Sequence, residues 1–90
     1  MNVRISMNYR GRVQGVGFRW RVSQIAKSFP CTGYVKNLPD GSVELLVEGE
    51  KDEAQGMVEG INLAMKGFWY DKTIDQREGN SHFGVFGIEN

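Results

Sequence analysis

A glycine-containing loop separates a strand pattern from a helix pattern near the start of the chain, and it restricts how those two elements can be joined. Residues 11–19 read Gly-Arg-Val-Gln-Gly-Val-Gly-Phe-Arg. Glycine lets the backbone turn sharply and direct several N–H groups into one concavity. The helix that follows adds the positive end of its dipole, and Arg19 adds a permanently charged fork of donors. The sequence therefore predicts a phosphate-binding loop between a strand and a helix.

The residues on either side of this loop have two different periods. Before it, apolar residues alternate with polar ones, which predicts a half-buried strand over residues 3–10: Val3, Ile5, Met7 and Tyr9. After it, apolar residues recur on one side of a helix: Phe18, Val22, Ile25, Ala26 and Phe29. Because proline disfavours helix at the residue before it, this helix is expected to end at Pro30.

The middle of the chain predicts a hairpin and a second helix. Strand patterns cover residues 32–38 and 42–48, and the residue types between them are those of a tight turn. Residues 50–66 carry an apolar stripe at helical spacing, with acidic residues in the first turn and Gly67 at the end.

The last third of the chain is less regular. A strand within residues 71–78 is expected although the segment is polar, and residues 82–88 have the better strand pattern. The element order β-α-β-β-α-β predicts an α+β fold of the ferredoxin-like sandwich type, with an antiparallel sheet and two helices on one face. Residues 1–90 are expected to form a single domain.

Cysteine and histidine are scarce, which limits the chemistry that the chain can perform. Cys31 is alone, so no internal disulfide and no cysteine metal site is expected, and the protein is predicted to be cytoplasmic. Cys31 and His82, the one histidine, are interpreted as packed or surface residues and not as catalysts. No apolar run reaches the ~20 residues of a membrane span, and the first residues lack a signal-peptide pattern.

The net charge of zero hides a strong asymmetry along the chain. Residues 1–39 hold seven of the eleven basic residues and none of the eleven acidic ones. One interpretation is that the two halves fold against each other and partly neutralise their charges. The other is that the basic half faces an anion.

Two segments resemble the signatures of one known family. Residues 11–19, quoted above, are similar to the first signature of the acylphosphatases. Residues 32–44, Thr-Gly-Tyr-Val-Lys-Asn-Leu-Pro-Asp-Gly-Ser-Val-Glu, are similar to the second. The resemblance implies hydrolysis of the carboxyl–phosphate bond of acyl phosphates, without metal or cofactor.

The resemblance also implies roles for individual residues. It assigns Arg19 as the arginine that binds phosphate, and Asn37 as the residue that positions the attacking water. The backbone amides of the loop would complete the phosphate site: Gln14, Gly15, Val16, Gly17, Phe18 and Arg19. These roles suit phosphoryl transfer, which depends on charge balance at the phosphoryl oxygens and on positioning of the nucleophile.

A binding module on the same fold is the alternative hypothesis, with nucleic acid or a small anion as its ligand and no catalysis. Recognition of RNA on such a sheet needs stacking aromatics on the central strands, and only Tyr9 stands out there. A sequence pI near 6.6 also disfavours nucleic acid, which requires dense positive charge. The expected partners are an acyl phosphate substrate and competing phosphate or sulfate, with no membrane, and a monomer is expected. The acyl group stays open.

Overall fold

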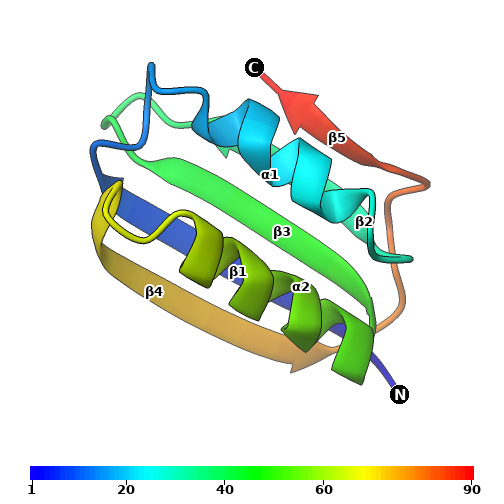
Figure 1. Ribbon diagram of the computed structural model, residues 1–90. Coiled ribbons are helices and arrows are strands. Elements are labelled where there is room, and N and C mark those ends of the chain that lie inside the picture. The colour runs from blue at the N-terminus through cyan, green and yellow to red at the C-terminus, as the bar shows by residue number, and fades with distance from the viewer.

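Two helices lie on one face of a five-stranded sheet, whose strand order is β4-β1-β3-β2-β5 (Figure 1). The computed structural model describes residues 1–90. Its elements are β1 (Asn2–Gly11), α1 (Phe18–Ala26), β2 (Thr32–Asn37), β3 (Val43–Glu50), α2 (Lys51–Ala64), β4 (Trp69–Glu78) and β5 (Phe86–Glu89). The ferredoxin-like sandwich expected from the element order is confirmed.

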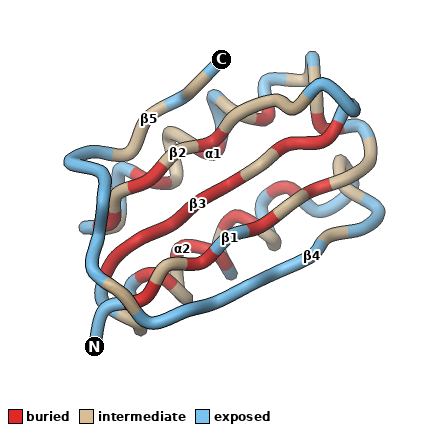
Figure 2. The backbone as a smooth tube through the Cα atoms, turned by 180° about the vertical axis from the view of Figure 1, so that it is seen from behind, coloured by how far each residue is buried: buried red, intermediate tan, exposed pale blue.

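The core lies between the helices and the central strands. The alternation predicted for β1 holds, because its four apolar side chains all face the helices and none is more than 2% exposed. Figure 2 shows buried residues concentrated along the middle of the sheet, while β4 is exposed along most of its length. Each fully buried side chain of this size stabilises the fold by roughly 1.5–3 kcal/mol.

The two C-terminal strands differ from the expectation. The prediction that residues 82–88 form the better strand is wrong, because β5 covers only Phe86–Glu89 and pairs in parallel with β2. The segment expected to be weak forms the ten-residue strand β4, antiparallel to β1. As an edge strand, β4 is held by its backbone pairing with β1 and needs no alternation of apolar residues.

Both helices are shorter than their apolar patterns. The helix expected to continue to Pro30 ends at Ala26, where the chain tightens into bonds of i to i−3 type. Phe29 lies beyond the helix and still packs against the core. Helix α2 begins after Glu50, whose carboxylate caps it by accepting from the backbone N–H groups of Asp52 and Glu53.

A buried carboxylate fixes the crossover from β4 to β5, which runs past one end of the sheet (Figure 2). Glu48 is 0% exposed and lies on the face of the sheet opposite the helices. It accepts four hydrogen bonds: from Arg4 Nε at 2.8 Å, Thr32 Oγ1 at 3.1 Å, the His82 backbone N–H at 2.9 Å and the Phe83 backbone N–H at 3.0 Å. These hydrogen bonds hold the crossover so that β5 lies beside β2.

The charge asymmetry is partly neutralised by contacts between the two halves of the chain. Arg4 pairs with Glu48 at 2.8 Å, and Arg10 pairs with Asp71 at 2.7 Å. The Arg10 guanidinium holds the pKa of Asp71 below its usual range. None of the helices has the length and apolar character needed to span a membrane.

Candidate active site

The loop between β1 and α1 contains two residues in the left-handed backbone region. Gly15 and Gly17 both have φ of 76°. A Cβ on either residue would meet no atom within 4 Å, so the requirement for glycine is conformational and not steric. Gly17 is the N-cap of α1 and offers no side chain to its N–H groups, and the first turn holds no acidic residue. The start of α1 is therefore suited to an external anion.

One side chain ties this loop to the turn between β2 and β3. The Gln14 amide donates to the carbonyl of Leu38 at 2.8 Å and to the carbonyl of Ser42 at 2.9 Å. Within that turn, the hydroxyl and the backbone N–H of Ser42 both donate to the carboxylate of Asp40 and lower its pKa. Because Asn37 directly precedes Leu38, Gln14 fixes the distance between the loop and Asn37.

Arg19 is held in place by one of its three nitrogens. Its Nη1 donates to the carbonyl of Glu89 at 2.9 Å and to Asn90 Oδ1 at 3.4 Å. Nε and Nη2 make no hydrogen bond to the protein, and no carboxylate forms an ion pair with Arg19. The charge is therefore uncompensated, and several N–H donors are free for a ligand.

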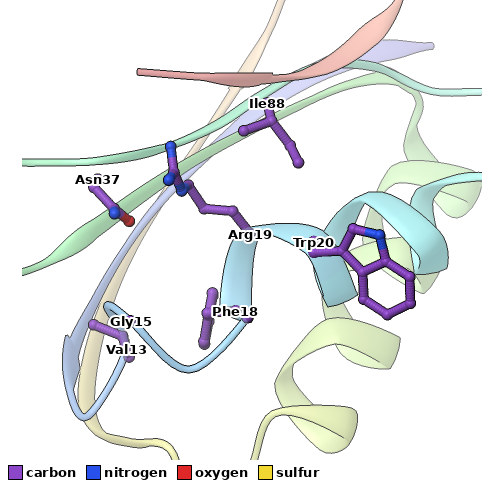
Figure 3. Close-up of a pocket in the computed structure, with 8 residues that line it drawn as sticks. Val13, Gly15, Phe18, Arg19, Trp20, Asn37 and Ile88 are labelled. Carbon is purple, nitrogen blue, oxygen red and sulfur yellow. The ribbon is translucent and has the colours of Figure 1, made fainter.

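Asn37, at the end of β2, carries an acceptor without a donor. Its Oδ1 is buried and has no hydrogen-bond partner, and no other buried side-chain polar atom is in that position. Figure 3 shows the amide of Asn37 directed toward the same space as the guanidinium of Arg19. An unsatisfied buried acceptor costs about 1–3 kcal/mol, so this atom is prepared to accept from a water or a ligand.

A cavity of about 200 Å³ joins these groups (Figure 3). Five of the predicted site residues line it: Gly15, Gly17, Phe18, Arg19 and Asn37. The two others do not, because Gln14 turns its side chain to the β2–β3 turn and Val16 packs against the core. Any role of those two residues in phosphate binding would fall to their backbone N–H groups.

Three lining residues were not expected from the sequence: Val13, Trp20 and Ile88. Val13 directly precedes the predicted residues of the loop, and Trp20 directly follows Arg19 in the helix. Their positions next to these residues could have indicated that they line the cavity. Ile88 comes from β5. The sequence pattern of residues 82–88 indicated an apolar strand residue at this position, but it did not indicate which segment that strand would contact.

Arg19 is the one charged residue that lines the cavity. The lining includes no histidine, cysteine or carboxylate side chain, and no cluster of such groups elsewhere could hold a metal ion. Cys31 does not line this cavity, and burial, together with Glu53 and Glu50, raises the pKa of its thiol. The arrangement offers donors for an anion beside one acceptor for a water.

The family model for acylphosphatases matches residues 5–81, a range that contains the loop, Arg19 and Asn37. The chain belongs to the acylphosphatase family. An acylphosphatase of Methanospirillum hungatei is 45% identical over 64 residues, which are 71% of this chain and 70% of the relative. That of Picrophilus torridus is 36% identical over 80 residues, 89% of this chain and 94% of the relative.

A solved acylphosphatase has the same fold. The crystal structure of the Bacillus subtilis acylphosphatase superposes with a TM-score of 0.87 at 31% identity, covering 98% of this chain and 99% of the other. The protein is thus a hydrolase of acyl phosphates. Nothing favours the nucleic-acid alternative, and Tyr9, the aromatic residue considered for stacking, is 0% exposed and packs in the core beneath the helices.

Proposed function

We propose that acyl phosphates are hydrolysed in the cavity between the glycine loop, Arg19 and Asn37, by direct attack of a positioned water on phosphorus. One observation carries this assignment. The unpartnered acceptor of Asn37 and the free donors of Arg19 border the same cavity. A phosphoryl group needs donors, and a nucleophilic water needs an acceptor, so the two halves of the reaction have complementary partners here.

The phosphoryl group is held by the loop and by Arg19. The backbone N–H groups from Gly15 to Arg19 donate to its oxygens at the positive end of α1. Nε and Nη2 of Arg19 add charge-assisted bonds, which are shorter and stronger than neutral ones. Because Nη1 is already bound to the Glu89 carbonyl, the guanidinium loses little freedom when the phosphate arrives.

The attacking water is held by Asn37. The water donates one hydrogen to Asn37 Oδ1, and this contact directs a lone pair of the water oxygen at phosphorus. An amide holds this water without repelling the phosphoryl dianion, as a carboxylate would. The oxygen–phosphorus bond forms, the bond from phosphorus to the acyl oxygen breaks, and the carboxylate leaves with the electron pair. The water's proton passes to the phosphate product. A carboxylate is a good leaving group, so no strong general acid is required.

Several finer statements belong to the same proposal. Charge balance comes from Arg19 and not from a metal, since the lining offers no carboxylate, the ligand that Mg²⁺ uses in phosphoryl transfer. Inorganic phosphate and sulfate compete with substrate at the loop. Residues 1–90 act as one monomeric, cytoplasmic domain, in keeping with a free thiol at Cys31.

Two substitutions separate the proposed roles. Arg19→Ala removes donors used in both ground state and transition state, so kcat/KM falls about 10²–10³-fold and inhibition by phosphate weakens. Asn37→Ala removes the water contact alone, so kcat falls while the inhibition constant of phosphate stays within a few-fold. Asn80→Ala, at an exposed asparagine outside the cavity, is the control and keeps wild-type kinetics. Normal phosphate inhibition of Arg19→Ala, or its loss in Asn37→Ala, would contradict the assignment.

Turnover in ¹⁸O-labelled water tests the point of attack. Attack on phosphorus places the label in phosphate and leaves the carboxylate unlabelled. Label in the carboxylate would show attack on carbon, and the role of Asn37 would then be wrong. A phosphorylated protein trapped during turnover would refute direct attack by water.

A further inference from the structure

One buried carboxylate connects the starts of the two strands whose other ends border the proposed site. Glu48 on β3 is paired with Thr32, the first residue of β2, while Asn37, the last residue of β2, lines the cavity. Strand β5 runs parallel to β2 and ends at Glu89, whose carbonyl accepts from Arg19. The buried carboxylate and the site therefore lie at opposite ends of the same two strands.

The crossover into β5 depends on Glu48 for its hydrogen bonds. Oε2 of this carboxylate accepts from the backbone N–H of His82 at 2.9 Å, and Oε1 accepts from that of Phe83 at 3.0 Å. Residues 80–84 make no other hydrogen bond, although the Phe83 ring lies against Tyr34 with ring centroids 5.4 Å apart. The same carboxylate accepts from side chains of β1 and β2, so its own position is fixed.

Strand β5 has few other attachments that hold its position. It has four residues, forms one edge of the sheet and pairs with β2 alone (Figure 1). Phe86 packs against the core, whereas Val85 is 73% exposed and Ile88 is 46% exposed. Strand β2, by contrast, is paired along its whole length with β3. Loss of the hydrogen bonds from Glu48 to the crossover would therefore displace β5 more than β2.

The orientation of Arg19 depends on the end of β5. Both of its hydrogen bonds to the protein go to Glu89 and Asn90, and the bond to the Glu89 carbonyl is the shorter at 2.9 Å. Figure 3 shows its guanidinium between Asn37 and Ile88, where β5 borders the cavity. A shift of β5 would remove this support. The donors of Arg19 would then have to be oriented again each time a phosphoryl group binds.

We propose that Glu48 is a positioning residue for the reaction: its carboxylate holds the crossover at the start of β5, and β5 holds the Arg19 guanidinium in the orientation that binds the phosphoryl group. The inference rests on the proposed function of the cavity. It assigns a role in catalysis to a side chain that lies on the opposite face of the sheet from the helices and does not line the cavity.

Steady-state kinetics of Glu48→Gln with acetyl phosphate test this role, at a low temperature where circular dichroism shows that the variant is folded. We expect kcat/KM to fall by about tenfold, within the ~10²-fold that a misplacement of about 1 Å can cost, and inhibition by phosphate to weaken by a similar factor. Val58→Ala is the matched control, because it truncates a buried side chain of α2 that does not line the cavity. It loses stability through a void in the core and keeps wild-type kinetics.

A double-mutant cycle shows whether the effect passes through the arginine. In the Arg19→Ala background, Glu48→Gln should change kcat/KM by less than about twofold, because no guanidinium remains to be oriented. In the Asn37→Ala background, the full effect should remain. Glu48→Asp keeps the charge but is one methylene shorter, so it cannot reach both crossover amides. It takes the place of Glu48→Gln in the cycle if that variant does not fold.

Three outcomes would overturn the positioning role of Glu48. They are wild-type kinetics of the Glu48 variant, an equal loss of activity in Val58→Ala, and a loss that persists undiminished in the Arg19→Ala background. Each of them leaves the proposed function intact, because Arg19→Ala and Asn37→Ala test that function by themselves. If Arg19→Ala alone retained full activity, the proposed function itself would fall and the role of Glu48 with it.

Discussion

Replacing Glu48 by glutamine tests whether one buried carboxylate holds the crossover that brings β5 to the site. The carboxylate divides its contacts evenly, since Oε1 accepts from Thr32 and Phe83 and Oε2 accepts from Arg4 and His82. Glutamine has nearly the same volume but carries one acceptor oxygen and one NH₂ group. No placement of that amide satisfies all four donors.

The cost follows from the best available placement. With its NH₂ group in place of Oε1, glutamine can donate to the Thr32 hydroxyl, but the Phe83 N–H is left without an acceptor. An orphaned donor costs about 1–3 kcal/mol, and the surviving bonds lose charge assistance worth about 1 kcal/mol. The free energy of unfolding should fall by about 3 kcal/mol, which lowers the Tm of a domain of this size by about 12–24 °C.

The pH dependence separates this effect from a general loss of packing. Burial alone would raise the pKa of Glu48, but the four hydrogen bonds outweigh it and hold the pKa below its usual range. A lowered pKa in the folded state means that the stabilisation is complete above the unfolded value of about 4.3. It is lost as the pH falls through the folded value. The difference between wild type and Glu48→Gln is thus full at neutral pH and shrinks in acid, while contributions from Asp40 and Asp71 cancel.

Urea unfolding followed by circular dichroism between neutral pH and strong acid measures this difference. Glu59→Gln, at an exposed carboxylate of α2 without a hydrogen-bond partner, serves as the control and should change stability by less than about 0.5 kcal/mol. Hydrogen exchange should also show lost protection at the amides of His82 and Phe83. The reasoning fails if Glu48→Gln matches the control, or if its deficit stays constant down to strong acid.

Two further predictions concern the loop and the source of charge. Gly17→Ala places a side chain at φ 76° and should cost about 1–2 kcal/mol of stability, while Gly84→Ala, in open space without a positive φ, should cost less than about 0.5 kcal/mol. Equal unfolding free energies for the two variants would argue against conformational strain in the loop. The rate of acyl phosphate hydrolysis should not change with EDTA or added Mg²⁺, because Arg19 supplies the positive charge in the proposed mechanism. A rate lost in EDTA and restored by metal would refute that prediction.

The first two thirds of the fold could be predicted because its elements are buried on one side only. Strand β1 and both helices pack one face on the core, and that packing imposes the periods of two and 3.6 that the sequence displays. The turn at Pro39–Gly41 follows from residue type. Positions of helix ends were less accurate, since Phe29 continues the apolar pattern of α1 while lying beyond its last helical residue.

The last third could not be predicted in the same way. Strand β4 lies at the edge of the sheet and contributes little to the core. It is held by backbone pairing with β1, so its sequence shows no alternation of apolar residues. Strand β5 has four residues and is positioned by Glu48, which is 34 and 35 residues distant from the two amides it accepts from. Local patterns do not report a contact over that separation.

The same distinction divides the candidate site. The loop glycines, Arg19 and Asn37 contribute to the cavity through properties of their own residue types, which are a positive φ, a fork of donors and an amide, so these properties can be predicted from the sequence. Glu89 contacts Arg19 through its carbonyl oxygen, which every residue has, and Ile88 lines the cavity with an apolar side chain of a kind that many residues have. These contributions depend on the position of β5 in the sheet and not on its residue types. The loop glycines, Arg19 and Asn37 are therefore visible in the sequence, while the contribution of β5 to the cavity emerges only once the crossover is in place.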